Sequence, residues 1–333
     1  MFSYKYDMKN KITLLTIIIV FIGLLSVYSS SHVWALYKYN DAFYFFKRQF
    51  IFVVLGLISM YITSKMDYQI YKKYYKVILI MSYILLILVL IPGIGMVRGG
   101  SRSWFNLGVF ALQPSEIFKI AIIMYSAMYI EKHYRDMKKL KTSFKLLFMI
   151  GIGFLLIMMQ PDFGSGVVMV CGVLVMVIVS PFPFKYFIGL GVLGIVGLIG
   201  MIISAPYRLK RILSFVNPFL DPLGSGFQAI QALYAIVPGG LLGVGFNNSI
   251  QKHFYLPEPQ TDFIFAIIAE ETGFLGASLL ILLYFYLFYL VIKVAMNADD
   301  LFGSLLSLGL ISVIAVQTFI NLGVVVGLLP VTG

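Results

Sequence analysis

Hydrophobic residues fall in long blocks that short polar segments separate. We identify nine blocks: Ile12–Ser29, Phe50–Thr63, Val77–Ile94, Ile117–Ile130, Leu146–Gln160, Gly166–Ser180, Tyr186–Ala205, Phe274–Val294 and Leu305–Leu329. Several are shorter than the ~20 residues that a membrane-spanning helix needs, so we expect their ends to extend into the flanks. No alternating pattern predicts the strands of a barrel. The pattern predicts an all-α polytopic membrane protein, with nine transmembrane helices in a single integral membrane domain (1–333).

The interval between the seventh and eighth blocks, residues 205–273, is too long for an ordinary connection. Loops of this length are usually functional or disordered. Its aromatic and apolar residues argue against disorder. We predict a large outward-facing loop of short helices and turns, packed on the membrane surface and carrying the active site.

Composition supports a membrane protein. Hydrophobic residues make up 60% and charged residues 12% of the chain, against about 45–50% and about 25% in soluble domains. The net charge of +11 does not indicate nucleic-acid binding, because the basic residues flank the apolar blocks. The single cysteine, Cys171, lies inside an apolar block and excludes a disulfide framework or a cysteine zinc site.

The distribution of charge predicts the orientation. With the N-terminus inside, most of the 25 Lys and Arg residues lie in cytoplasmic segments, as the positive-inside rule requires. Small residues at positions 29–31 could form a cleavage site, so a cleaved signal peptide is the alternative interpretation of the first block. The remaining loops favour an uncleaved first helix.

Four polar groupings lie in the predicted outward segments. The first joins Gly99–Trp104 to a helix start at Pro114, with Glu116 in its first turn. Lys119 follows one turn deeper in the membrane. An ionisable group inside a span indicates function by default. A purely structural Glu116–Lys119 ion pair remains the alternative.

Two further groupings flank the sixth and seventh blocks. In Gln160–Gly166, Asp162 is either the acceptor of a tight turn or a site residue. In Pro206–Arg211, three cations run against the positive-inside rule. Arg208 and Arg211 suit the phosphate of an anionic lipid, because arginine forms forked hydrogen bonds to phosphate. Ordinary contact with lipid headgroups is the alternative.

The fourth grouping places two carboxylates at the boundary between water and membrane. Glu258 and Asp262 stand four residues apart, where a proline-bracketed loop turns into an apolar helix. A carboxylate there can activate a hydroxyl nucleophile, or hold Mg2+ or Mn2+ against a pyrophosphate. A plain helix cap at Asp262 is the structural alternative.

These groupings, in this order, resemble the SEDS family (shape, elongation, division and sporulation). The matching strings are GSRSWFNLGVFALQPSE, QPDFGSG, PYRLKRILSFVNPFLDPLGSGFQ, QKHFYLPEPQTDFIFAIIAEETGFLG and QTFINLGVVVGLLPVTG. The string YLPEPQTDFIF is more similar to the FtsW and SpoVE branch than to RodA. The family usually has ten helices and continues past VTG, where this sequence stops at Gly333.

The resemblance implies a peptidoglycan glycosyltransferase of the bacterial cytoplasmic membrane. It would polymerise lipid II, the undecaprenyl-pyrophosphate disaccharide-peptide, at the outer face, during division or sporulation. Asp262 matches the essential loop aspartate of the family, and we expect it to be the catalytic residue and also to bind the metal ion. The expected substrate-binding positions are Arg102, Glu116, Lys119, Asp162, Arg208, Arg211 and Glu258. The implied partner is a class B penicillin-binding protein, a transpeptidase. A lipid II flippase and a non-enzymatic scaffold for that transpeptidase are the alternative functions.

Overall fold

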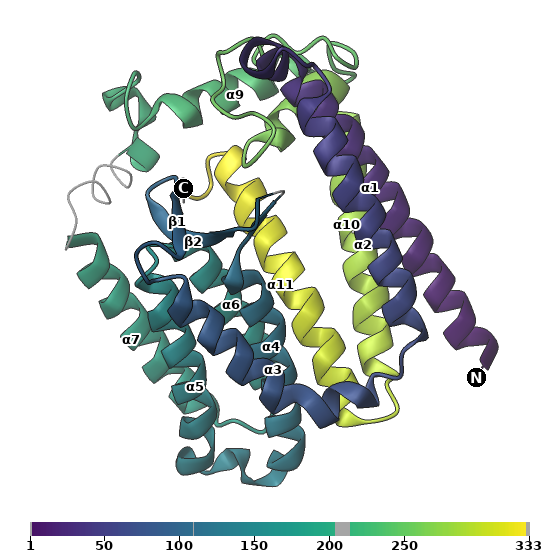
Figure 1. Cartoon of the computed structure of the whole chain (residues 1–333), viewed down its shortest axis with the longest axis vertical. Coiled ribbons are helices and arrows are strands. Elements are labelled where there is room, and N and C mark those ends of the chain that lie inside the picture. The colour runs from purple at the N-terminus through teal and green to yellow at the C-terminus, as the bar shows by residue number, and fades with distance from the viewer. Residues whose placement is uncertain (1, 109, 204–213, 331–333) are drawn as a thin grey trace. The chain divides into compact units, whose positions relative to one another are not determined.

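The computed structural model describes residues 2–330 except residue 109 and residues 204–213 (Figure 1). In this part of the chain, each of the nine predicted blocks overlaps one helix, although some blocks run past the helix end. The helices are α1 (Phe2–Tyr39), α2 (Tyr44–Lys65), α3 (Gln69–Leu88), α4 (Pro114–Lys132), α5 (Leu140–Met158), α6 (Phe163–Val179), α7 (Phe184–Ile203), α10 (Ile264–Met296) and α11 (Leu301–Val325). Among the described helices, α1, α2, α5, α10 and α11 are long and apolar enough to cross a membrane. The predicted polytopic helical membrane protein is confirmed.

Most helices extend beyond their apolar blocks, as expected from the length of a bilayer span. The helical backbone hydrogen bonds continue through polar residues that flank the apolar blocks. In α1, for example, Lys11 pairs with Asp7 one turn earlier at 2.6 Å, a spacing that supports a helix. The described part of the long interval contains the 3-10 helix η2 (Pro218–Leu220), α9 (Phe227–Gly239) and turns.

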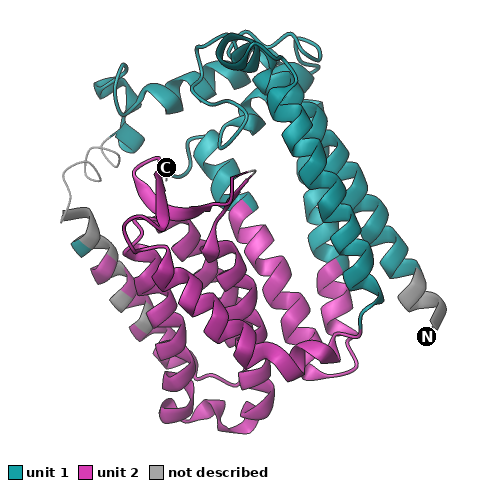
Figure 2. Cartoon of the chain, in the orientation of Figure 1, with its two compact units in different colours: residues 1–66, 198–290, 318–331 teal, residues 67–197, 291–317, 332–333 magenta. Residues whose placement is uncertain are grey.

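The chain divides into two compact units (Figure 2). Unit 1 comprises residues 1–66, 198–290 and 318–331, and unit 2 comprises residues 67–197, 291–317 and 332–333. The long helices α10 and α11 each contribute to both units. The two units are described separately below.

Unit 2 has a helical core and a small sheet that the sequence analysis missed. Helices α3 to α6 bury apolar side chains against one another, among them Phe118, Met169 and Met176. Strands β1 (Gly95–Arg98), β2 (Ser101–Asn106) and β3 (Ala111–Leu112) form an antiparallel sheet in the order β1-β2-β3. Gly99 and Gly100, with φ of 56° and 82°, form the two-residue hairpin turn, which requires positive φ at both positions. The 3-10 helix η1 (Tyr134–Lys138) connects α4 to α5.

An ion network in unit 2 joins α3, α4 and the start of α11. Lys72 lies 2.9 Å from Glu131 and 2.8 Å from Asp300. Asp300 also accepts hydrogen bonds from the Gln69 side chain and the Gly303 amide. Burial alone would raise the pKa of Asp300, but the bonds from Lys72, Gln69 and Gly303 outweigh it and lower the pKa to about 2.

We expect this network to make stability sensitive to acid. The folded-state pKa of Asp300 lies below the ordinary value of 3.8, so its contribution, about 2 kcal/mol, is present above pH 4 and lost as the pH falls toward 2. In detergent, Asp300→Asn should melt below the native protein at pH 6, and this gap should close between pH 4 and pH 2. Asp136→Asn, at an exposed ion pair with Lys139, is the matched control and should show a small gap throughout. A constant gap for Asp300→Asn would contradict the assignment.

In unit 1, α10 is broken at Gly273, which has φ 67° and ψ −170°. The segment 240–245 fills the break. Amides 244 and 245 donate to the carbonyls of Glu270 and Glu271, at 3.0 Å each. Beyond the break, amides 274 and 275 donate to carbonyls 240 and 241, at 2.8 and 3.1 Å. The backbone groups that the break frees are therefore satisfied within the protein, as the interior of a membrane requires.

Gly273→Ala should displace segment 240–245. A Cβ at Gly273 would lie 2.3 Å from the Gly243 nitrogen, and the backbone conformation is one that only glycine adopts readily. We expect a loss of about 1–3 kcal/mol in the free energy of unfolding, measured by denaturation in detergent. Gly23→Ala in α1, where a Cβ meets nothing within 4 Å, is the control and should not destabilise. Equal stability of both variants would contradict this account of the break.

Candidate functional site

The Glu258–Asp262 turn carries both predicted loop carboxylates. The amide and hydroxyl of Thr261 donate to the Glu258 carbonyl, at 3.1 and 2.9 Å, and close the turn. Glu258 has φ 44°, an uncommon conformation for this residue that is typical of functional loops. Both carboxylates are exposed, and neither accepts a hydrogen bond from the described residues. Asp262 therefore does not serve as the cap of α10.

Two buried side chains fix this turn in unit 1. Leu256 precedes it and Phe263 follows it, with exposed fractions of 1% and 3%. Both belong to an apolar cluster with Ala232 and Ala235 of α9, Ala266 and Ile267 of α10, and Val324 and Val325 of α11. The turn is thus anchored on a buried apolar cluster, and its two acidic residues lie at the surface.

Surrounding protein atoms and the neighbouring Glu258 carboxylate raise the pKa of Asp262. Partial desolvation disfavours the charged form, and a second negative charge disfavours it further. A carboxylate with a raised pKa is a better base near neutral pH. The arrangement suits proton abstraction from a hydroxyl, or the neutralisation of a cation.

In unit 2, α4 carries the predicted Glu116–Lys119 pair. The Lys119 ammonium lies 2.8 Å from a Glu116 oxygen. Its side chain is 3% exposed, whereas that of Glu116 is 52% exposed. The two residues form an ion pair, and the Glu116 side chain remains half-exposed. This geometry fits a purely structural ion pair and equally fits a role in binding substrate.

Asp162 acts as a structural acceptor. Its side chain caps α6 by accepting from the Ser165 amide at 3.2 Å, and it accepts from the Gln113 side chain at 2.6 Å. The bond to Gln113 connects the start of α6 to the residue that precedes α4. The turn-acceptor alternative therefore describes its observed contacts, and a role in binding substrate stays a prediction.

Arg102, on β2, also contacts its own unit. Its Nη1 donates to the Leu90 carbonyl at 3.4 Å, while its buried Nε has no hydrogen-bond partner in the described residues. Nearby in the sheet, Ser101 donates to the backbone carbonyl of Gln160, whose side chain donates to the Leu86 carbonyl. The predicted first and second groupings thus meet at one end of unit 2.

The predicted site residues fall into three sets. Asp262 and Glu258 belong to unit 1, and Arg102, Glu116, Lys119 and Asp162 belong to unit 2. Arg208 and Arg211 lie outside the described residues. Sequence reasoning missed a buried polar cluster in unit 1 that includes Ser29, Lys252 and Glu271. The adjacent Glu270 and Glu271 in an apolar stretch were its sequence signal.

The described residues hold no group of three or more His, Cys, Asp or Glu side chains that could alone bind a metal ion. Glu258 and Asp262 nevertheless fit one class of site. Mg2+ is often held by one or two carboxylates together with substrate phosphates. Burial raises the pKa of Asp262 most, and the neighbouring Glu258 charge, which a bound cation would offset, raises it further.

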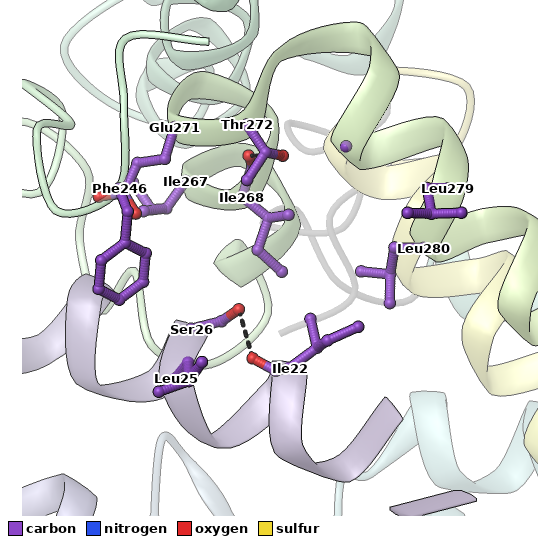
Figure 3. Close-up of a pocket in the computed structure, with 11 residues that line it drawn as sticks. Ile22, Leu25, Ser26, Phe246, Ile267, Ile268, Glu271, Thr272, Leu279 and Leu280 are labelled. Carbon is purple, nitrogen blue, oxygen red and sulfur yellow. Dashed lines mark hydrogen bonds between the residues drawn. The ribbon is translucent and has the colours of Figure 1, made fainter. Parts of the chain in front are cut away.

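A cavity of about 250 Å³ lies in unit 1 between α1 and α10 (Figure 3). Apolar residues of both helices line it, with Phe246 at one side and Glu271 as its charged member. The Ser26 hydroxyl donates to the Ile22 carbonyl, as in many apolar helices. Neither Asp262 nor Glu258 lines this cavity, so we do not assign the reaction to it.

Comparison with known proteins identifies the family of this chain. Residues 9–333 match the model of the FtsW, RodA and SpoVE family, described as cell cycle proteins. Stage V sporulation protein E of Bacillus subtilis (strain 168) is 49% identical over 327 residues, covering 97% of this chain and 88% of the relative. The probable peptidoglycan glycosyltransferase FtsW of Trichlorobacter lovleyi is 39% identical over 333 residues, covering 99% and 86%.

Solved structures agree in fold. A chain of a peptidoglycan synthase complex that coordinates polymerisation and crosslinking matches with a TM-score of 0.79 and 28% identity, covering 97% of this chain and 88% of that one. An aspartate-to-alanine mutant of the rod shape determining protein RodA from Thermus thermophilus matches with a TM-score of 0.70 and 25% identity, covering 97% and 87%. The greater similarity to SpoVE and FtsW confirms the predicted branch. The chain belongs to the FtsW, RodA and SpoVE family.

Proposed function

We infer that this multi-pass membrane protein is a peptidoglycan glycosyltransferase that polymerises lipid II into glycan strands. The observation that carries the proposal is the Glu258–Asp262 turn, in which two acidic residues at the surface are anchored on a buried apolar cluster and the pKa of Asp262 is raised. Relatives named as peptidoglycan glycosyltransferases support it. The role is in division or sporulation.

The proposed chemistry is a single displacement. Asp262 accepts the proton of the acceptor 4-hydroxyl, whose oxygen attacks the anomeric carbon of the donor sugar. The bond from that carbon to the pyrophosphate breaks, and undecaprenyl pyrophosphate leaves with its electron pair. Configuration at the anomeric carbon inverts. The raised pKa of Asp262 makes it a suitable proton acceptor.

Cationic residues stabilise the departing pyrophosphate in this proposal. Lys119, Arg208 and Arg211 supply the positive charge, because fixed cations favour the charge that develops as a phosphate leaves. Arg102, Glu116, Asp162 and Glu258 complete the proposed substrate-binding set. Asp262, with Glu258, would hold Mg2+ or Mn2+, and the ion would supply further neutralisation of the pyrophosphate.

Location and partner follow from the same proposal. Lipid II polymerisation at the outer face of the bacterial cytoplasmic membrane requires the 205–273 loop outside, which agrees with the charge bias toward a cytoplasmic N-terminus. A class B penicillin-binding protein would crosslink the strands. A solved structure similar to this chain belongs to a peptidoglycan synthase complex that coordinates polymerisation and crosslinking, which supports such a pairing.

The test is glycan synthesis from purified lipid II, by the protein alone and with its transpeptidase, in Mn2+ and in EDTA. We expect polymer in Mn2+ with the partner present, and less in EDTA if the carboxylate turn holds a metal. Movement of lipid II across vesicles without polymer would instead support the flippase. Loss of transpeptidase binding in loop variants, with no polymer from the native protein, would support the scaffold.

A further inference from the structure

Unit 1 also contains a buried charge cluster. It consists of Ser29 of α1, Lys252 of the loop, and Glu270 and Glu271 of α10, all at most 4% exposed. Lys252 lies 3.2 Å from a Glu271 oxygen, and the Ser29 hydroxyl donates to both Glu271 oxygens at 2.6 and 2.7 Å. Burying three ionisable groups is costly unless each is paired.

The cluster holds the loop that carries Asp262. Ser249 donates its hydroxyl to Glu270 at 2.5 Å, and the Ile250 amide donates to the same carboxylate at 2.8 Å. The Lys252 ammonium also reaches the Asn247 side chain at 2.9 Å. Residues 247–252 are therefore bound to two successive carboxylates of α10.

Both ends of this loop rest on the first half of α10. At one end, amides 244 and 245 donate to the carbonyls of Glu270 and Glu271. At the other, Leu256 and Phe263 pack in the apolar cluster with Ile267. Both ends of the loop 245–262 are therefore attached to α10. The buried charge cluster attaches residues 247–252 of the loop to the same helix.

Among the described residues, Lys252 is the one cation that forms an ion pair with Glu271. Burial lowers the pKa of Lys252, and the ion pair with Glu271 opposes that shift only in part. Without the Lys252 ammonium, the Glu271 carboxylate would still accept the hydrogen bond from Ser29, but no positive charge would balance it. The carboxylate would then have to take up a proton or move toward water, and either change loosens the loop.

We propose that Lys252 and Glu271 are positioning residues that hold the Asp262-bearing loop in register with its substrate. The inference rests on the proposed glycosyltransferase function. A displacement of about 1 Å in a reacting group costs on the order of 100-fold in rate. The loss should fall on kcat, because Lys252 and Glu271 are buried and would act on the substrate through the loop that they hold.

The test compares Lys252→Met with the native protein in nanodiscs, measuring kcat and KM per folded molecule and amide hydrogen exchange over residues 245–262. We expect kcat to fall about 100-fold with KM changed less than about 3-fold, and exchange to rise across that loop. Lys252→Arg keeps the charge and should recover most of kcat. If Lys252→Met does not fold, Lys252→Met/Glu271→Gln removes both charges and should show the same kcat loss.

The matched control is Lys72→Met, which breaks the ion network with Glu131 and Asp300 in unit 2. It should lower thermal stability and leave kcat per folded molecule unchanged. Native kcat and unchanged loop exchange in Lys252→Met would overturn the proposal. A native protein that makes no polymer would overturn the proposed function instead, and the exchange measurement would still decide whether Lys252 orders the loop.

Discussion

Asp262→Ala is expected to abolish glycan polymerisation, with kcat lowered by about 10³-fold or more, while the protein folds normally. Removal of a general base costs about 10²–10⁴-fold. Normal folding is expected because the Asp262 carboxylate is exposed and accepts no hydrogen bond from the described residues, whereas Leu256 and Phe263 anchor the turn. Polymer resolved on a gel gives the activity, and thermal melting in detergent gives the folded fraction.

Two variants sharpen this prediction. Asp136→Ala, at an exposed ion pair in η1, is the matched control and should retain full activity. Glu258→Gln removes the negative charge that helps to raise the pKa of Asp262. The reactive carboxylate form of Asp262 would then persist to lower pH, so the acid limb of kcat/KM should shift downward. An unshifted limb would contradict Asp262 as the titrating base.

The Glu116–Lys119 pair provides the second large effect. Glu116→Gln leaves the Lys119 ammonium buried without its carboxylate. Breaking a fully buried pair costs about 3–5 kcal/mol, and we expect about 1–2 kcal/mol here because Glu116 is half-exposed. Chemical denaturation in detergent measures this loss.

A double variant separates structure from catalysis at this pair. Lys119→Met/Glu116→Leu removes both charges and should recover the stability that Glu116→Gln loses. If Lys119 also stabilises the departing pyrophosphate, polymerisation should remain about 10²–10³-fold below native. Recovery of both stability and activity would show that the pair is only structural.

The long apolar runs made the helices predictable, since a span must satisfy its own backbone. The β1–β2 hairpin was missed because its strands are short and lie among polar residues, and only the Gly99–Gly100 pair marks it. The break in α10 was also missed. The predicted block began at Phe274, while the helix begins at Ile264 and continues past Gly273.

The candidate site likewise has parts that the sequence predicts and parts that only the fold reveals. The Glu258–Asp262 turn was predictable, because prolines bracket it and its carboxylates are neighbours in sequence. The partners of Glu271 were not, because Ser29 lies 242 residues away and only the fold brings the two together. Asp162 shows the converse, since its local role as a helix cap was the alternative that its contacts support.

The most direct test of the central claim is gel-resolved glycan synthesis from purified lipid II. Native protein and Asp262→Ala would be purified side by side, matched for folded protein and supplied with the same transpeptidase. The proposed mechanism predicts long glycan strands from the native protein and none from the variant. Equal polymer from both would contradict the role of Asp262, and no polymer from either would contradict the glycosyltransferase itself.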